Sequence, residues 1–354
     1  MKRILLTGDF LRPLEADPRE SESLRRIRWF EDLLAPPLAL VTDLPVQRLA
    51  CEGQRQLASL YADAGLTPSL EAWAQLFAGP IEGRLARRIV DLFRDAIVIS
   101  IELPPSVATL LRSADVPIID AAVDAHRFLY DIPLAWRSTV AEVREALASF
   151  RVSSFEIRRR AAQIKAKSRW IYPIAVPEGA TLVLDQVASD SAMIDPQRRR
   201  RVGWCDFQGE LARLKASGPI IWRPHPNNVE ANSPAIAELL GDAQQSGANF
   251  YHMLAHDNLA RVVAISSGGV IEARAFGKEG IHLMNRWAGI GLDGWDHAAP
   301  VIGDWLSPHF WSAVLQPLID TRPDVPVIPP EKDFLRRATN WDWGFGWIDQ
   351  IVVR

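Results

Sequence analysis

Residues 96–105 read AIVISIELPP, a short apolar run that ends in one glutamate and two prolines. The β-branched run Ala96–Ile101 predicts a strand, and the prolines mark where it stops. This strand delivers the carboxylate of Glu102 at its carboxyl end. The segment decides the fold class, because the rest of the chain repeats the same alternation of short apolar strands and amphipathic helices.

The first half of the chain follows this pattern on both sides of residue 96. Apolar residues recur at helical spacing over Glu20–Leu34, and we expect this helix to stop at Pro36-Pro37, before a strand over Leu38–Thr42. Further strands are expected over Lys2–Thr7 and Pro117–Asp120, and further helices over Arg55–Phe77, Ile81–Arg94, Val107–Ser113 and Val140–Lys167.

The second half repeats the alternation after a cluster of Pro173, Pro177 and Gly179. Strands are expected over Thr181–Leu184, Pro219–Trp222, Val262–Ile265 and Gly280–Met284, with helices between them, as over Arg198–Ala216 and Pro234–Gln245. Such alternation is typical of doubly wound α/β domains. We therefore expect an α/β fold with two Rossmann-like domains, residues 1–170 and 171–335, facing each other across a cleft. In residues 336–354 we expect a helix that crosses back to the first domain.

Composition excludes several classes of protein. The chain has 354 residues, 48% hydrophobic and 23% charged, which suits a globular protein with two full cores. Its 40 Lys and Arg against 43 Asp and Glu leave a net charge of -3, so nothing favours a nucleic-acid partner. Two cysteines, Cys51 and Cys205, are too few for a disulfide framework.

The sequence carries no targeting or spanning signal that we can identify. The N-terminal apolar run Ile4–Leu6 is shorter than a signal peptide requires, and later apolar stretches are shorter than a membrane span. We therefore expect a cytoplasmic protein. The basic runs Arg158–Arg160 and Arg198–Arg201 leave two interpretations open. They either make a peripheral contact with the inner face of the inner membrane or are ordinary solvated helix faces.

The first candidate site follows the predicted strand that ends at Ile265. Ser266-Ser267-Gly268-Gly269 leads from this strand into helical spacing, so hydroxyls and backbone N–H groups meet at a helix N-terminus, where a phosphate can be held without metal. The spacing is neither that of a dinucleotide fingerprint nor that of a P-loop. Glu272, one turn inside the helix, reaches a ribose hydroxyl or simply favours the helix dipole. A plain capped helix start explains the same residues equally well.

The second candidate site is Arg223-Pro224-His225-Pro226, which follows the predicted strand Pro219–Trp222. Two prolines restrict the backbone on either side of His225 and leave its imidazole at the strand end, where open α/β sheets bind ligands. Cationic side chains at Arg223 and His225 would suit a phosphate or a carboxylate.

The third candidate site follows the predicted strand Thr181–Leu184. Asp185 and Gln186 lie at the strand tip, and Asp190 lies in the next loop or first helical turn. Either aspartate could face a substrate, and helix capping is the ordinary alternative for each of them.

The first domain supplies the polar groups expected on the facing wall. They are Glu102 after its strand and the pair His126-Arg127, for which a surface ion pair with Asp124 or Asp131 is the alternative. The sequence has no HExxH motif, no Cys/His cluster and no DxD motif with flanking carboxylates, so we expect no bound metal.

Three motifs stand in order along the second half. They are Asp185-Gln186...Asp190-x-Ala192, Arg223-Pro224-His225-Pro226, and Ser266-Ser267-Gly268-Gly269-x-x-Glu272-Ala273...Gly277-Lys278. Together they resemble the bacterial capsule and lipopolysaccharide transferases that move 3-deoxy-manno-octulosonic acid (Kdo) from CMP-Kdo, and above all the retaining β-Kdo transferases. The resemblance covers residues 182–280 and extends only loosely to the first domain. Arg223 stands where that family usually has Lys, and Val270-Ile271 replace its common Gly-Phe.

The resemblance implies a GT-B architecture in which the C-terminal domain binds most of the CMP-sugar. It implies a retaining transfer of β-Kdo to a saccharide acceptor of a bacterial capsule, O-antigen or glycolipid, with no metal and no cofactor besides the CMP-Kdo donor. A covalent intermediate on an aspartate would give retention, as in retaining glycosidases. Asp190 is the first choice for this nucleophile and Asp185 the second, with Glu102 as acid/base.

The remaining residues are assigned to binding. Nucleotide-sugar contacts are expected from Gln186, Arg223, His225, Pro226, Ser266, Ser267, Gly268, Gly269 and Glu272, and acceptor or sugar contacts from His126 and Arg127. Two other functions stay open: a sialic acid or other ulosonic acid transferase of the same fold, and a non-catalytic α/β binding protein. Neither the acceptor nor the oligomeric state is indicated by the sequence.

Overall fold

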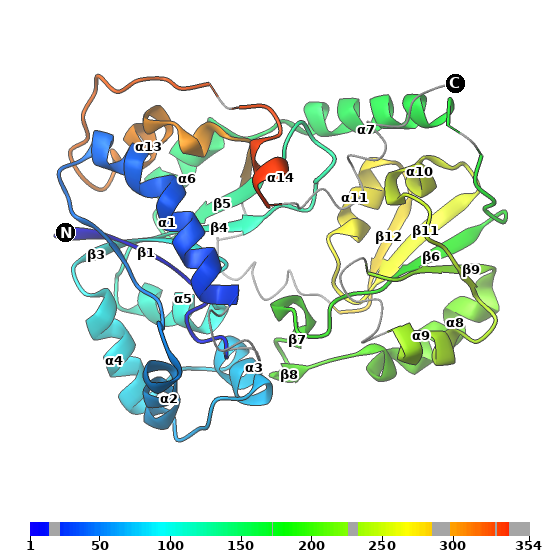
Figure 1. Cartoon of the computed structure of the whole chain (residues 1–354), viewed down its shortest axis with the longest axis horizontal. Coiled ribbons are helices and arrows are strands. Elements are labelled where there is room, and N and C mark those ends of the chain that lie inside the picture. The colour runs from blue at the N-terminus through cyan, green and yellow to red at the C-terminus, as the bar shows by residue number, and fades with distance from the viewer. Residues whose placement is uncertain (14–21, 172, 226–232, 285–297, 330, 340–354) are drawn as a thin grey trace.

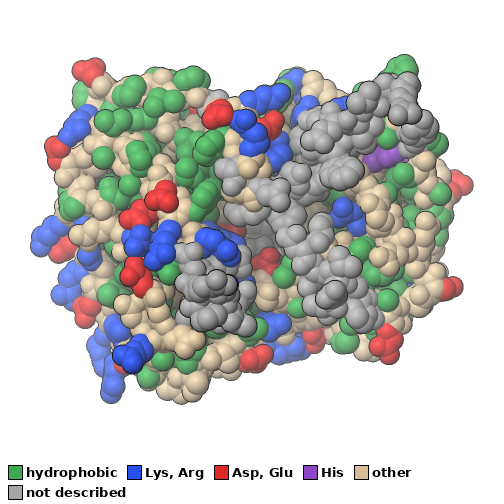
Figure 2. All heavy atoms as spheres, in the orientation of Figure 1, with side chains coloured by type: hydrophobic (Ala, Val, Ile, Leu, Met, Phe, Trp, Pro, Cys, Tyr) green, Lys and Arg blue, Asp and Glu red, His purple; other side chains and the backbone are tan. Residues whose placement is uncertain are grey.

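The protein has two α/β domains side by side (Figure 1). The computed structural model describes residues 1–13, 22–171, 173–225, 233–284, 298–329 and 331–339. Each domain has a central sheet with helices on both faces, and the α/β fold class predicted from the sequence is confirmed. Over the first domain, acidic and basic side chains lie close to one another on the face shown in Figure 2.

The first sheet has six strands in the order β13-β5-β4-β3-β1-β2. The four strands from β4 to β2 are parallel, and β5 and β13 add an antiparallel edge. The strands are β1 (Arg3–Gly8), β2 (Val46–Arg48), β3 (Ala96–Ile101), β4 (Ile118–Val123), β5 (Leu134–Ser138) and β13 (Ala299–Val301). The helices around this sheet are α1 (Glu22–Val41), α2 (Gln54–Asp63), α3 (Leu70–Ala78), α4 (Gly83–Phe93), α5 (Pro105–Ser113), α6 (Ala141–Ala148), α13 (Pro308–Leu315) and α14 (Phe334–Thr339).

Strand β3 explains why this sheet is buried on both faces. Ile97 and Ile99 pack into the core formed with α1, α6 and α13, whereas Val98 packs into the opposite core formed with α2 to α5. Successive side chains of a strand point to opposite faces, so a strand that is buried along its whole length needs helices on both of them.

The second sheet has five parallel strands in the order β10-β9-β6-β11-β12. They are β6 (Ala180–Leu184), β9 (Ile220–Arg223), β10 (Gln244–Gln245), β11 (Leu259–Ala264) and β12 (Glu279–His282). Its helices are α7 (Ser154–Ser168), α8 (Gln208–Ser217), α9 (Ser233–Leu240), α10 (Phe250–Ala255) and α11 (Gly269–Ala275). Short elements complete this half: the 3-10 turns η1 (Ser191–Met193) and η2 (Trp204–Phe207), and the antiparallel pair β7 (Ile194–Asp195) and β8 (Arg200–Arg201). A third turn, η4 (Asp304–Leu306), precedes α13.

One predicted strand is wrong. Residues 38–42 do not form a strand, because α1 continues through Pro36 and Pro37 to Val41. Leu34, Leu38 and Val41 continue the buried stripe of this helix into the first core. The burial of this stripe outweighs the backbone hydrogen bonds lost at the prolines, so tertiary packing overrides a local stop signal.

Two predicted long helices are interrupted. The region 55–77 contains α2 and α3, and the region 140–167 contains α6 and α7. The second interruption is a domain crossing, because α6 packs in the first domain and α7 packs on α10 and α11 of the second. The predicted helix over 198–216 is also shorter, since β8 and η2 precede α8.

The chain crosses between the domains earlier than the expected boundaries at 170 and 335. Ala161 and Ile164 of α7 are buried in the second core, and β13 pairs with β5 in the first sheet. The two crossings meet where the amide of Val152 donates to the carbonyl of Pro300 at 2.8 Å. Leu335 of α14 packs into the first core, and the expected C-terminal helix beyond residue 339 lies outside the described residues.

Candidate functional site

The three sequence motifs meet at the carboxyl ends of β6, β9 and β11. They surround a cleft of about 60 Å³ that also touches the first domain. Its lining consists of Arg127, Leu184, Asp185, Arg223, Pro224, His225, Phe250, Tyr251, Ser267, Gly269 and Glu272. Because the carboxyl ends of parallel strands lie at one edge of a sheet, residues far apart in the chain converge there.

Asp185 is the most buried acidic group at the tip of β6. Its Oδ1 accepts from the Trp204 indole at 2.9 Å and from the Gln186 amide at 2.8 Å. Its Oδ2 is buried and has no hydrogen-bond partner among the described residues. Burial raises the pKa of Asp185, against the lowering effects of the Trp204 donor and of the nearby amides of Gln186 and His225. A buried carboxylate oxygen without a donor is costly, which is typical of a site that awaits a ligand or a reaction.

Gln186 and Ser266 form a clamp between the ends of β6 and β11. The Ser266 amide donates to Gln186 Oε1 at 2.7 Å, and Gln186 Nε2 donates to Ser266 Oγ at 3.1 Å. The Ser266 hydroxyl in turn donates to the carbonyl of Ala192 at 2.6 Å. Both side chains are buried, and neither lines the cleft. These hydrogen bonds hold the strand ends together, and the predicted nucleotide contacts of the two residues stay a prediction.

The turn before α11 presents Ser267 and Gly269 to the cleft. The Gly269 amide donates to Ser267 Oγ at 3.3 Å, and the Ser267 carbonyl contacts His282 Nε2 at 2.9 Å. A Cβ at Gly269 would stand 2.6 Å from Leu184 Cδ1 and 3.1 Å from Phe250 Cζ, so a larger residue would have to displace these side chains. Gly268 lies against Ala125 of the first domain rather than in the cleft. Since α11 has only seven residues, the hydroxyl and the cationic side chains are the stronger anion ligands here.

Arg223 and His225 stand at the end of β9. Arg223 Nε donates to the carbonyl of Ala248 at 3.2 Å. Burial, together with the positive charges of Arg127 and Arg223, lowers the pKa of His225 to about 4, while the charge of Asp190 opposes them. With this pKa the imidazole of His225 is neutral at neutral pH, whereas the sequence analysis predicts a cation at this position. An anion that enters would stabilise the imidazolium. Pro226, the fourth residue of the motif, lies outside the described residues.

Glu272 joins the two domains. Its Oε1 accepts from the Arg127 amide at 3.0 Å and from the Tyr251 hydroxyl at 2.9 Å. Burial raises the pKa of Glu272 to about 7, against the lowering effects of Arg127, Tyr251 and His126. The carboxyl was expected to reach a ribose or to favour the helix dipole, and its hydrogen bonds show that it holds the first-domain loop against the second domain.

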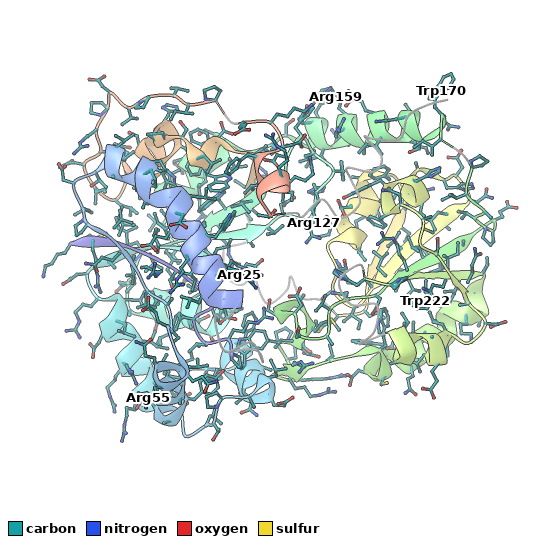
Figure 3. The ribbon with its side chains drawn as sticks, viewed as in Figure 1. Arg25, Arg55, Arg127, Arg159, Trp170 and Trp222 are labelled. Atoms are coloured by element: carbon teal, nitrogen blue, oxygen red, sulfur yellow. The ribbon has the colours of Figure 1, made fainter. Side chains whose placement is uncertain are left out.

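The loop between β4 and β5 carries the two expected acceptor contacts. Figure 3 labels Arg127 at the boundary between the domains. Its backbone carbonyl accepts from Arg336 Nη2 of α14 at 2.8 Å, so the loop is held from the C-terminal side as well. His126 does not line the cleft, because its Nδ1 contacts Asp124 at 2.8 Å. Burial alone would lower the pKa of His126, but the bond to Asp124 outweighs it and raises that pKa.

Asp190 takes the capping role that was its alternative in the sequence. It is exposed and is the N-cap of η1, where its Oδ1 accepts from the Ala192 amide at 2.9 Å. It does not line the cleft, although its charge acts on His225. Asp185 lies in the cleft wall.

Glu102 stands in a separate acidic and basic cluster at the strand ends of the first domain. It pairs with Arg26 of α1 and has a φ of 53°, a left-handed backbone that is rare for a residue with a side chain. Non-glycine residues in this region cost free energy and often mark functional sites. Glu102 lines a cavity of about 20 Å³ together with Asp9, Arg12 and Ser191.

Asp9 is the residue of this cluster that sequence reasoning missed. Its Oδ2 accepts from the Trp73 indole at 2.9 Å, and burial raises its pKa to about 6. The available signal was the dipeptide Gly8-Asp9 directly after the first predicted strand, which has the same strand-end position as Glu102. The pair becomes visible only when β1 and β3 are known to be neighbours.

Among the described residues, no group of three or more His, Cys, Asp or Glu side chains is arranged to hold a metal ion. No helix within the described part of the chain combines the length and the apolar character that a bilayer crossing requires.

Comparison with known proteins gives a distant structural likeness. No family model matches the chain, and no curated protein matches it. Two similar solved structures are of KpsC from Thermosulfurimonas dismutans. The beta Kdo 2,7 transferase has a TM-score of 0.33 and 16% identity, covering 56% of this chain and 69% of that chain. The beta Kdo 2,4 transferase has a TM-score of 0.38 and 12% identity, covering 79% of each chain.

Proposed function

We propose that this protein is a retaining glycosyltransferase that moves β-Kdo from CMP-Kdo to a saccharide acceptor of a bacterial surface polysaccharide or glycolipid. The observation that supports the proposal is the convergence of three separate segments, at Asp185, Arg223–His225 and Ser267–Glu272, on one cleft at the edge of the second sheet. These segments are the ones whose motifs resemble the β-Kdo transferases.

The leaving group is a cytidine monophosphate, whose phosphate charge grows as the bond to the sugar breaks. In the proposal, Arg223 and the Ser267 hydroxyl face this phosphate. His225 is neutral before the donor binds, and the phosphate favours its protonated form. These groups are placed before the reaction, so they stabilise the developing charge without reorganising. The proposal includes no metal and no cofactor other than the donor substrate.

Asp185 is the proposed nucleophile. Its buried Oδ2 attacks the anomeric carbon, the bond from that carbon to the phosphate oxygen breaks, and CMP leaves with the electron pair. The acceptor hydroxyl then attacks the same carbon, the bond to Asp185 breaks, and the hydroxyl proton passes to a base. Two inversions give net retention. Asp190, the first choice from the sequence, becomes the second choice here, because its oxygen already caps η1.

Glu102 is the proposed base for the acceptor hydroxyl. Its contact with Arg26 and its left-handed backbone hold the carboxylate at the end of β3. It shares a cavity lining with Ser191, the residue that follows Asp190, and so stands on the side of the first domain that meets the second. This placement is what a base acting across the domain boundary requires.

The direct test is donor turnover. The purified protein is mixed with CMP-Kdo or with CMP-sialic acid, plus Kdo-containing oligosaccharides as acceptors, and released CMP is measured. We expect release from CMP-Kdo alone. Release from CMP-sialic acid would favour the other ulosonic acid transferase, and CMP binding with no release from either donor would favour the non-catalytic protein.

Peripheral membrane contact is a separate part of the proposal, and it rests on α7. Residues 151–170 carry seven basic residues and one acidic residue in a chain of net charge -3. Phe155 is 65% exposed and Trp170 is 73% exposed, at opposite ends of this helix. Figure 3 labels Trp170 and Arg159 along it. Aromatic side chains beside cations suit an anionic lipid surface, where each Lys or Arg near the surface contributes about 1 kcal/mol.

Vesicle sedimentation tests this contact. We expect the protein to bind phosphatidylglycerol vesicles and not phosphatidylcholine vesicles, and we expect Trp170→Ala to weaken the binding. Leu92→Ala is the matched control, because Leu92 is an exposed apolar residue outside α7. Equal binding to both kinds of vesicle would contradict the proposal.

A further inference from the structure

A second and larger pocket lies on the first domain. Its volume is about 480 Å³, within the range of pockets that hold small-molecule ligands. One wall is the segment from Phe77 to Glu82 after α3, and another is the face of α5 that carries Ser106, Thr109, Leu110 and Ser113. Ser191, Ile194 and Pro196 from the η1–β7 segment close it from the other side.

The polar atoms of the α5 wall are already satisfied inside the protein. The hydroxyl of Ser106 donates to the Leu76 carbonyl. Thr109 donates to the Pro105 carbonyl at 2.8 Å, and Ser113 donates to the Leu110 carbonyl at 2.7 Å. These three hydroxyls therefore have no proton left to donate to a ligand, and the remaining contacts on this wall are apolar.

Of the three charged residues in the lining, Glu82 is exposed, and Arg137 and Glu102 are engaged inside the protein. Arg137 donates to Asp120 Oδ2 through Nε at 3.0 Å and through Nη2 at 2.6 Å. Glu102 pairs with Arg26. The other described lining includes Phe77, Ile81, Leu103, Leu110 and Ile194, which are all hydrophobic.

This lining discriminates between ligand classes. A sugar unit buried here would find few donors for its hydroxyl oxygens, at about 1–3 kcal/mol for each group left unsatisfied. A hydrocarbon chain loses nothing in such a lining and gains about 0.8 kcal/mol for each CH₂ removed from water. The pocket therefore favours an apolar chain over a glycan.

The pocket borders Glu102, the proposed base. Glu102 and Ser191 line both this pocket and the small cavity around Asp9. A chain held in the pocket would thus present the head group attached to it beside Glu102, the proposed base.

We propose that this pocket binds the apolar chain of an amphipathic acceptor and places the hydroxyl of its head group next to Glu102. The assignment of the chain to an acceptor rests on the proposed transferase function, whereas the binding of the chain does not. The ligand class is a single-chain glycolipid with a polar head.

The test uses n-alkyl β-glucosides of six to ten carbons, below their micelle concentrations, titrated calorimetrically into the full-length protein. We expect affinity to rise about fourfold for each added CH₂, which corresponds to about 0.8 kcal/mol per methylene, while glucose alone does not bind. Thr109→Trp fills the pocket from an exposed position and should abolish this dependence on chain length.

Two more variants control for folding and position. Ser113→Trp is a second filling variant at an exposed residue of the pocket, and Arg112→Trp places the same side chain on the same helix outside it. The dependence of affinity on chain length should vanish in Ser113→Trp and persist in Arg112→Trp, and both variants should keep the wild-type melting temperature. Equal affinity for all chain lengths, or a dependence that survives both filling variants, would overturn the proposal.

CMP titration separates this proposal from the proposed function. CMP is expected to bind in the second domain with equal affinity in wild type and Thr109→Trp. Chain binding without CMP binding would leave the pocket assignment standing and remove the transferase. CMP binding and turnover without chain binding would support the transferase and remove the pocket assignment.

Discussion

The cleft of the second domain and the pocket of the first domain differ in how they are built. The cleft is small, at about 60 Å³, and its polar lining comes from strand ends that Gln186 and Ser266 clamp together. The pocket is about eight times larger and is lined by a helix face and a crossing segment, with its hydroxyls turned into the protein. In our proposals, the polar cleft carries the charge chemistry and the apolar pocket binds the chain of the acceptor.

The largest expected effect concerns the cleft. Asp185→Asn removes the proposed nucleophile and should lower CMP release from CMP-Kdo by about 10³-fold or more, since the carboxylate acts in the transition state. Circular dichroism serves as the folding check. Asp190→Asn should cost far less, because the amide oxygen can still cap η1. A larger loss in Asp190→Asn would exchange the roles of the two aspartates.

The next effect concerns the buried ion pair between Asp120 and Arg137, beside the first-domain pocket. Arg137→Met leaves Asp120 buried without its cation, and the free energy of unfolding should fall by about 3–5 kcal/mol in urea titration. CMP affinity should stay unchanged, because the altered residue is in the other domain. The double variant Asp120→Leu/Arg137→Met should recover much of the stability. An unchanged free energy of unfolding in Arg137→Met would show that this ion pair does not stabilise the first domain.

The pH dependence of stability tests the contact between Glu272 and the Arg127 loop, which joins the two domains. The pKa of Glu272 is raised from its ordinary 4.5 to about 7, so its stabilising contribution is complete below pH 4.5 and is lost as pH rises through 7. The loss is on the order of 3 kcal/mol. Glu272→Gln should remove this part of the pH profile of unfolding. The exposed Glu142→Gln is the matched control, and an identical profile in both variants would contradict the buried joint.

The smallest expected effect is the coupling of anion binding to His225. The pKa of His225 is about 4 in the empty cleft and should rise when CMP binds, so CMP affinity should increase as pH falls. If the bound pKa returns to its ordinary 6.5, the gain between pH 7.5 and 5.5 is about tenfold relative to His225→Gln. This ratio cancels the titration of CMP itself. A ratio that does not change with pH would place the phosphate away from His225.

Elements that depend on neighbouring residues were predicted correctly, whereas elements that depend on contacts between distant segments were not. Strand β3 was predicted over its exact residues, because an apolar run between turn residues is a local signal. The end of α1 was not, because Leu38 and Val41 are held by the first core rather than by their neighbours in sequence. The domain crossings were displaced for the same reason, since nothing local distinguishes a helix of one domain from a helix of the other.

The candidate site shows the same division. Asp185, Arg223, His225 and Ser267 were found because polar residues at the carboxyl ends of strands share one sheet edge. Which polar residues face the cleft was not predictable. Ser266 and Ser267 are adjacent, yet one hydroxyl is buried against Ala192 and the other lines the cleft.

The amino-acid sequence alone predicts the two α/β sheets and the polar groups at their strand ends. Both signals, the hydrophobic periodicity and the polar residue after each strand, are contained in a few consecutive residues. Three placements follow only from the tertiary structure: Glu272 accepts a hydrogen bond from the Arg127 loop, Asp9 lines a cavity with Glu102, and α5 and β7 line one pocket. These juxtapositions depend on burial between segments far apart in the chain, and no local pattern of residues encodes that.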